Sequence, residues 1–324
     1  MKTYLVLSVL ALLMTGCASI ENGVFATGLA VERSLSGLEK KQIQLSDHHW
    51  HYLEGGDPSL PTVVLLHGFA ANKDNWIRMV RHLDGYHVII PDLPGHGDSS
   101  FNGDLYYGFD VQSRRLAEFV DALDLPTFHL VGNSMGGAVA ALYAYRHPSQ
   151  VKTLTLIDAV GFYGEEESEL QKRLARNEPN PLIIRDEDGF DAFLDFVLAD
   201  KPFLPWPAAS VLGRQAKARE QANDHIFEHI YAEIDAARYA GGFGHIYGKL
   251  QMPALIVWGD KDPVLHVSSV NLFFDYLENA EVNVFPGVGH APMVERPKQT
   301  AQLLGDFWLR QDSQRAVDDI SQQE

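Results

Sequence analysis

Short apolar runs alternate along the chain with longer stretches in which apolar residues recur at helical spacing. The runs have the length and composition of buried strands and lie at 62–66, 86–90, 127–131, 151–157, 253–258 and 281–285. The stretches of helical character lie at 72–83, 106–123, 138–145, 267–277 and 297–309. This alternation predicts an α/β fold with a mainly parallel sheet and helices on both of its faces.

Two stretches depart from this rhythm. Residues 42–53 alternate between apolar and polar and then turn at a Gly-Gly-Asp-Pro sequence, which predicts an antiparallel hairpin that opens the sheet. Residues 161–245 contain helical stretches and a proline-broken patch but no strand-like run, and they are too long for a plain connection. We therefore expect an inserted helical cap at 161–245, a core made of 41–160 and 246–310, and a frayed polar tail at 311–324.

The first residues have the features of a bacterial export signal. Lys2 provides a positive charge, and residues 4–14 form an apolar segment too short to span a bilayer comfortably. The sequence Met-Thr-Gly-Cys that ends at Cys17 resembles a lipobox, in which the cysteine becomes the lipidated N-terminus. This resemblance implies a signal peptide at 1–16, a lipidated helical tether at 17–40, and a place in the cell envelope, with the alanine after the cysteine pointing to the outer membrane. The alternative is an ordinary cleaved signal with an incidental cysteine.

Composition and charge limit the kinds of partner that the protein can bind. With 46% hydrophobic and 21% charged residues, the 324-residue chain has the composition of a globular protein and not of a disordered one. Its formal net charge of -17 disfavours nucleic acid as a partner and offers no basic attraction to anionic lipid. Cys17 is the single cysteine, so no intramolecular disulfide can form. We therefore expect the chain to reach the membrane through a lipid anchor at Cys17.

The strongest chemical signal is the sequence GNSMG at residues 132–136. It matches the G-x-S-x-G nucleophile elbow, and it lies between a predicted strand and a predicted helix, as that motif requires. A serine on such a turn holds Oγ above the sheet, and the glycines leave room where strand and helix crowd together. The helix N-terminus offers free N–H groups to a developing oxyanion. Ser134 is therefore the candidate nucleophile; the alternative is a glycine-rich turn that only joins strand to helix.

Five segments together resemble the α/β-hydrolase superfamily, over about residues 42–309. They are HGF at 67–69, DLPGHGDSS from Asp92, GNSMGG from Gly132, VWGDKDPV from Val257 and GVGHAP from Gly287. More narrowly, HGFAANKDNW, DLPGHGDSS, GNSMGG and LIDAVGF are similar to bacterial lipases and esterases of the cold-adapted Moraxella and Psychrobacter type. The GNSMGG segment also occurs in C–C bond hydrolases of aromatic degradation.

The resemblance implies a Ser-Asp-His triad that works through an acyl-enzyme. Matched residue by residue, it makes Ser134 the nucleophile, Asp262 the acid and His290 the general base. Asp260 and Asp158 also follow predicted strands, and both stay open as alternatives for the acid.

The oxyanion hole implied by the family consists of the backbone N–H groups of Phe69 and Met135, and no cofactor or metal is implied. We therefore expect a serine hydrolase, an esterase or lipase, that cleaves carboxylic esters of small molecules or lipids. The alternatives are a C–C bond hydrolase acting on a dienoic acid and a catalytically idle envelope binding protein of the same fold.

Overall fold

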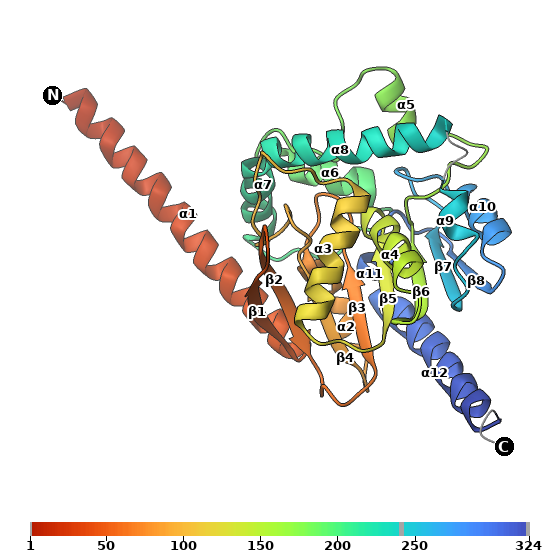
Figure 1. Ribbon diagram of the computed structural model, residues 1–324. Coiled ribbons are helices and arrows are strands. Elements are labelled where there is room, and N and C mark those ends of the chain that lie inside the picture. Colours follow the sequence, from red (N-terminus) through yellow and green to blue (C-terminus); the bar gives the residue numbers. More distant parts are fainter. Residues whose placement is uncertain (1, 240–242, 322–324) are drawn as a thin grey trace.

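The computed structural model describes residues 2–239 and 243–321, and it has the predicted α/β architecture (Figure 1). Within these residues, eight strands form one sheet: β1 (Leu38–Gln44), β2 (His49–Gly55), β3 (Thr62–Leu66), β4 (His87–Pro91), β5 (Phe128–Asn133), β6 (Val151–Ile157), β7 (Ala254–Gly259) and β8 (Ala280–Phe285). Their order across the sheet is β1-β2-β4-β3-β5-β6-β7-β8. Strands β3 to β8 pair in parallel, whereas β2 pairs antiparallel with both β1 and β4.

Helices cover both faces of this sheet. One layer contains α3 (Phe109–Ala122), α4 (Met135–Arg146), α9 (Gly244–Tyr247) and α10 (Ser269–Tyr276), and the other contains α2 (Ile77–Val80), α11 (Pro292–Glu295) and α12 (Pro297–Ser321) (Figure 1). In β3, Val64 and Leu66 point to the first layer, and Val63 and Leu65 point to the second. All four side chains are fully buried. Burial on both faces explains why the central strands are uninterrupted apolar runs.

The N-terminal helix α1 (Lys2–Leu35) projects away from the body (Figure 1). Cys17 lies within α1, but its side chain, like those of residues 2–16, lies outside the described part of the chain. In the described residues, no helix has the length and apolar character needed to cross a membrane. The predicted tether includes residues that belong to the sheet, because β1 begins at Leu38, whose side chain is buried in the core. The remaining side chains of β1 are mostly exposed and polar, so the strand begins before the predicted hairpin region at 42–53. Strands β1 and β2 pair antiparallel as expected, but the chain turns between them at residues 45–48.

Helix α1 contacts the body along its C-terminal half. Arg33 donates two hydrogen bonds, of 2.8 and 2.7 Å, to the carboxylate of Asp74 in the short 3-10 helix η1 (Lys73–Trp76). Glu21 forms an ion pair of 2.8 Å with Arg214.

The helix predicted at 72–83 is divided in the structure into two short pieces, η1 and α2.

In the described part of the segment between β6 and α9, there are four helices: α5 (Glu169–Ala175), α6 (Gly189–Val197), α7 (Ala208–Ala218), which carries Arg214, and α8 (Glu220–Tyr239). They lie over one end of the sheet, where the strands that carry the candidate site residues end (Figure 1). The described residues of this insertion contain no strand.

The C-terminal segment differs from the expectation of a frayed tail. Helix α12 continues to Ser321. Asp312 contacts Nε2 of His129 at 3.3 Å and Nζ of Lys152 at 3.6 Å, and Arg315 donates to the carbonyl of Lys152 at 2.7 Å. These contacts with β5 and β6 hold the polar end of α12, where residues 311–317 bury no apolar side chain.

Candidate active site

Ser134 stands at the sharp turn between β5 and α4. Its φ of 53° and ψ of -118° place it in a region that non-glycine residues rarely adopt. Its N–H donates to the carbonyl of Ile157 at 2.9 Å, and its carbonyl accepts from the N–H groups of Gly137 at 3.0 Å and Val160 at 3.1 Å. These three bonds to neighbouring segments hold the strained backbone and keep the serine side chain at the end of the sheet.

Two glycines make this turn possible by close approach. A Cβ atom on Gly132 would lie 2.2 Å from the carbonyl oxygen of Gly136, and one on Gly136 would lie 2.5 Å from the carbonyl oxygen of His67. Both clashes are with backbone atoms, which cannot rotate away. The elbow helix therefore packs against β5 and the end of β3 only with glycine at these positions.

Asp262 and His290 come together from the loops that follow β7 and β8. Nδ1 of His290 lies 2.7 Å from Oδ2 of Asp262. Oδ1 of Asp262 accepts from the N–H groups of Val264 at 2.7 Å and Leu265 at 3.0 Å. The Asp262 side chain is fully buried. A carboxylate fixed by two backbone donors can hold the imidazole with Nδ1 protonated and Nε2 free to accept a proton.

The elbow is tied to the histidine loop through Asn133. Its Nδ2 donates to the carbonyl of His290 at 3.3 Å and to that of Ile157 at 3.1 Å. Among the described residues, no hydrogen bond joins Oγ of Ser134 to the His290 ring. In substrate-free sites this bond is often long or poorly aligned, so the geometry keeps Ser134 and His290 as candidate partners.

The two alternative acids have other roles in the structure. Oδ1 of the partly exposed Asp260 accepts from the N–H of Gly287 at 2.7 Å and so braces the loop after β8. Asp158 is fully buried, and its Oδ1 accepts from the N–H of Gly259 at 2.9 Å. Of the three carboxylates, Asp262 is the one that contacts the His290 ring.

Ligand-type atoms of Asp158, Asp262 and His290 lie within 4.8 Å of one another, which is close enough for a metal site. Both oxygens of Asp262 and Nδ1 of His290 are already engaged in the hydrogen bonds described above. We therefore assign Asp262 and His290 to their mutual hydrogen bond and assign no metal to the three groups.

Phe69 and Met135, the candidate oxyanion-hole residues, line one cavity together with Ser134. The loop that carries Phe69 is fixed by His67, whose Nδ1 donates to the carbonyl of the next residue at 2.8 Å and whose Nε2 accepts from the N–H of Leu93 at 3.0 Å. Burial lowers the pKa of His67, which keeps the ring neutral and suited to this pattern. His67 therefore shapes the loop and has no free nitrogen for chemistry.

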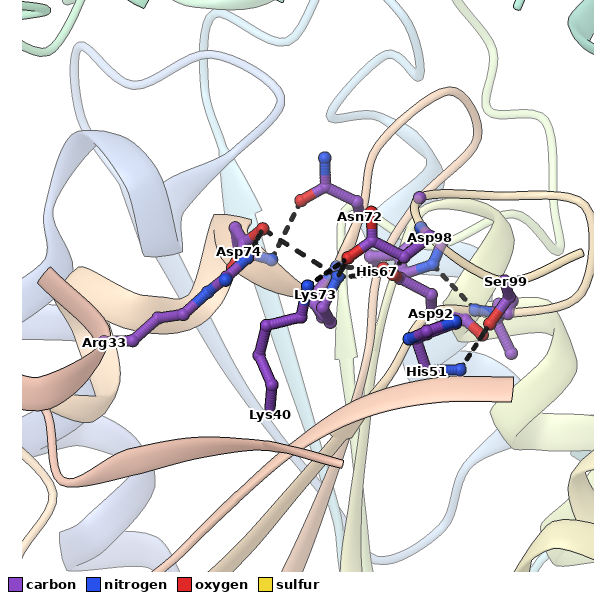
Figure 2. Close-up of polar contacts among 12 residues, drawn as sticks. Arg33, Lys40, His51, His67, Asn72, Lys73, Asp74, Asp92, Asp98 and Ser99 are labelled. Carbon is purple, nitrogen blue, oxygen red and sulfur yellow. Dashed lines mark hydrogen bonds and ion pairs between the residues drawn. The ribbon is translucent and has the colours of Figure 1, made fainter. Parts of the chain in front are cut away.

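A network of ion pairs around Lys73 holds the chain just after the loop that carries Phe69 (Figure 2). Nζ of Lys73 lies 2.6 Å from Oδ2 of Asp92 and 2.9 Å from Oδ2 of Asp98, and the N–H of Lys73 donates to Oδ1 of Asp92 at 2.7 Å. Burial has the largest single effect and lowers the pKa of Lys73, but the charges of Asp92 and Asp74 and the hydrogen bonds to Asp92 and Asp98 together outweigh it and raise the pKa, so the lysine stays charged. The bidentate pair between Arg33 and Asp74 extends this network to α1.

The cavity beside Ser134 has a volume of about 120 Å³. Its walls come from the ends of the strands and from cap helices α5 and α8. Most of its lining is apolar and includes Phe69, Val160, Leu170, Phe227, Ile230 and Leu265. An apolar space next to a nucleophile suits an apolar acyl group.

Glu295, which no sequence motif indicates, joins the cap to the histidine loop. Its Oε1 accepts from the N–H of Gly289 at 2.8 Å, and its Oε2 accepts from the N–H groups of residues 199–200 at 3.0 and 2.8 Å. The N–H of His290 also donates to the carbonyl of Val197 in α6 at 2.8 Å. The cap thus positions the histidine loop as well as covering the cavity.

Known proteins resemble this chain in sequence and fold. The model of the alpha/beta hydrolase fold family matches residues 61–196. Lipase 1 of Psychrobacter immobilis is 35% identical over 94% of this chain and 96% of its own length. Lipase 3 of Moraxella sp. (strain TA144) is 36% identical over 90% of this chain and 92% of its own length. The chain belongs to the α/β-hydrolase family.

A solved structure described as a membrane phospholipase A and bacterial virulence factor matches this α/β-hydrolase with a TM-score of 0.86. It is 40% identical, and the match covers 96% of this chain and 99% of that one. The predicted fold, the resemblance to lipases of the Moraxella and Psychrobacter type, and the enzyme class of carboxylic ester hydrolase are confirmed by these relatives. The roles of individual site residues stay predictions.

Proposed function

We propose that this α/β-hydrolase cleaves lipid or other carboxylic esters with apolar acyl groups, using Ser134 as nucleophile, His290 as general base and Asp262 as its orienting acid. One observation carries the proposal: a strained elbow serine opens into an apolar cavity close to a buried Asp262–His290 hydrogen bond of 2.7 Å. Three parts of the chain supply these groups at one end of the sheet, where α/β folds bind ligands.

In the first half of the reaction, Oγ of Ser134 attacks the acyl carbonyl while Nε2 of His290 takes the hydroxyl proton. The carbonyl oxygen becomes an oxyanion and receives hydrogen bonds from the N–H groups of Phe69 and Met135. Losing one such donor typically costs about 3 kcal/mol of transition-state stabilisation. The ester C–O bond then breaks, and His290 returns its proton to the leaving alcohol.

In the second half, water attacks the acyl-enzyme and His290 takes the proton of that water. The tetrahedral intermediate collapses, the bond between acyl carbon and Ser134 breaks, and the serine regains a proton from His290. Asp262 stays ionised throughout and stabilises the imidazolium that forms twice in each turnover.

The cavity supports ester substrates over the C–C bond alternative. A dienoic acid carries a carboxylate that has to be paired when it enters a buried site. In the described part of the chain, the residues that line the cavity include no lysine or arginine. An uncharged ester with an apolar acyl chain needs no such partner, which agrees with the lipase names of the relatives.

Attachment to the envelope membrane through a diacylglyceryl group on Cys17 belongs to this proposal. Helix α1 carries Cys17 beyond the body of the protein, and the solved relative is described as a membrane enzyme. Several acyl chains on one residue give stable anchoring, which the acidic surface alone would not provide. The outer membrane is the expected site.

Hydrolysis of p-nitrophenyl esters from acetate to palmitate by the full-length protein tests the proposed reaction. Ser134→Ala should lower kcat by roughly 10⁴ or more, because the proposed reaction loses its nucleophile. Ser313→Ala, which changes an exposed serine on α12, is the matched control and should keep full activity. Near-normal turnover by a folded Ser134→Ala variant would contradict the proposal. The preferred chain length in the wild type distinguishes an esterase from a lipase.

A further inference from the structure

Asp158 is a buried carboxyl group that the reaction above does not use. It follows β6 directly, its exposed fraction is 0%, and its φ of 43° lies in the left-handed region. Oδ1 accepts one hydrogen bond, from the N–H of Gly259 at 2.9 Å. Oδ2 is equally buried, and the described residues supply it with no hydrogen-bond donor. Because an ionised carboxylate with a bare, buried oxygen would be costly, this environment favours the neutral acid.

The charged neighbours of Asp158 make ionisation still less favourable. Its ligand-type atoms lie within 4.8 Å of those of Asp262 and His290. Burial raises its pKa well above the usual range, and the negative charges of Asp262 and, more weakly, Glu295 add to this. A proton on Asp158 removes the repulsion and turns its second oxygen into a donor.

The hydrogen bonds decide which of the two neighbouring carboxyl groups holds that proton. Asp262 accepts from the N–H groups of Val264 and Leu265 and faces Nδ1 of His290, so it has three partners that favour an anion. Within the described residues, Asp158 accepts from a single N–H, that of Gly259. Two carboxyl groups this close ionise one at a time, and the better-solvated one is the anion.

We propose that Asp158 is a positioning residue of the catalytic pair: a neutral carboxylic acid that donates its proton in a hydrogen bond to the Asp262 carboxylate. This inference rests on the proposed function, because it acts through Asp262 on His290. The hydrogen bond fixes the carboxylate and draws off part of its negative charge. Nε2 of His290 is thereby kept less basic than it would be beside an Asp262 without that donor.

Two substitutions separate the neutral donor from other roles. Asp158→Asn has the same shape and is permanently neutral, it can donate through Nδ2, and asparagine tolerates a positive φ. Asp158→Gly removes the side chain at a φ that glycine adopts without strain. The readout is the pH profile of kcat/KM, whose acid limb reports ionisation of the essential base in the free enzyme.

We expect Asp158→Asn to keep the acid limb of the wild type, with kcat within about threefold, because the donor is conserved. Asp158→Gly should move the acid limb to higher pH by about half a unit or more, because Asp262 then presents its full charge to His290. An infrared difference spectrum of wild type minus Asp158→Asn at neutral pH should show the carbonyl band of a protonated carboxylic acid. Glu233→Gln is a matched control, because it makes the same change from carboxyl to amide at a partly buried residue whose pKa burial raises, but on α8 away from the triad.

Three results would overturn the inference. If the acid limb of kcat/KM moved to lower pH by about one unit or more in Asp158→Asn, an ionised Asp158 would have been raising the basicity of His290 in the wild type. An unchanged acid limb in Asp158→Gly would show that no donor to Asp262 was lost. Absence of the carboxylic acid band would exclude the neutral state. Each of these results can occur while Ser134→Ala and Asp262→Asn remain inactive, so a failure here is distinguishable from a failure of the proposed function.

Discussion

Replacing Lys73 with methionine tests whether the buried network behind the oxyanion loop stabilises the protein. Lys73 is 1% exposed, and its Nζ lies 2.6 Å from Asp92, which is 0% exposed. Removing one partner of a buried pair costs about 3–5 kcal/mol, because the other charge is left uncompensated. Asp92 keeps the backbone N–H groups of residues 73 and 98, at 2.7 and 2.8 Å, so we expect the lower end, about 3 kcal/mol.

Lys40→Met is the matched control, because both lysines pair with Asp98. Nζ of Lys40 lies 3.0 Å from Asp98, but the two side chains are 48% and 47% exposed. An exposed pair of this kind contributes at most about 1 kcal/mol. Comparing the two variants therefore separates the effect of burying an ion pair from the effect of losing an ion pair as such.

Thermal unfolding of the full-length variants, followed by circular dichroism at neutral pH, is the assay. With roughly 2–4 °C per kcal/mol for a large domain, Lys73→Met should lower Tm by about 6–12 °C and Lys40→Met by no more than about 4 °C. Equal shifts for the two variants would refute the reasoning, because they would mean that the buried ion pair adds nothing beyond an exposed one. Activity should fall with Lys73→Met even below its Tm, since the Phe69 loop loses its support.

The acid of the triad is tested by Asp262→Asn, which should lower kcat by roughly 10⁴. Asp260→Asn should keep kcat within about tenfold of wild type. If Asp260→Asn caused the larger loss of kcat, Asp260 and not Asp262 would be the acid. Cys17→Ser should shift the protein from the membrane to the soluble fraction, and an unchanged membrane fraction would count against lipidation. Asp158→Asn should raise Tm relative to wild type by an amount that grows as pH rises above about 4. A carboxyl whose pKa is raised by folding stabilises the native state below its unfolded pKa, and this stability is lost as pH rises towards the folded pKa. A Tm difference that is constant with pH would show that Asp158 does not take up a proton on folding.

The central sheet could be predicted from the sequence because each inner strand is buried on both faces. Val63 to Leu66 have to be apolar without interruption, and an apolar run this short is typical of a buried strand. The edges could not be predicted in the same way. Strand β1 buries Leu38 and exposes most of its other side chains, and the end of α12 is held by Asp312 and Arg315, whose partners lie on β5 and β6. Polar contacts with distant segments leave no periodic pattern.

The residues proposed to react could be predicted for a different reason. Chemistry restricts their type, and the fold restricts where along the chain they occur, so Ser134, Asp262 and His290 each stand after a strand within a recognisable segment. The residues that support them are not restricted in this way. Glu295 accepts only from backbone N–H groups, which every residue except proline provides, so its partners in the cap carry no sequence signal.

The role of Asp158 could not be predicted from the sequence, although the motifs around it are recognisable. By position along the chain alone, Asp158 and Asp262 are similar candidates, since each follows a parallel strand and both strands end at the same edge of the sheet; only the family resemblance favours Asp262. The difference between them lies entirely in their donors: one backbone N–H for Asp158, and two backbone N–H groups and an imidazole for Asp262. Because donors favour the anion, the structure turns two equal carboxyl groups into an acid and a carboxylate. In any buried pair of carboxyl groups, the one that accepts more hydrogen bonds is the better anion and can orient a histidine. The other can only donate a hydrogen bond to that anion.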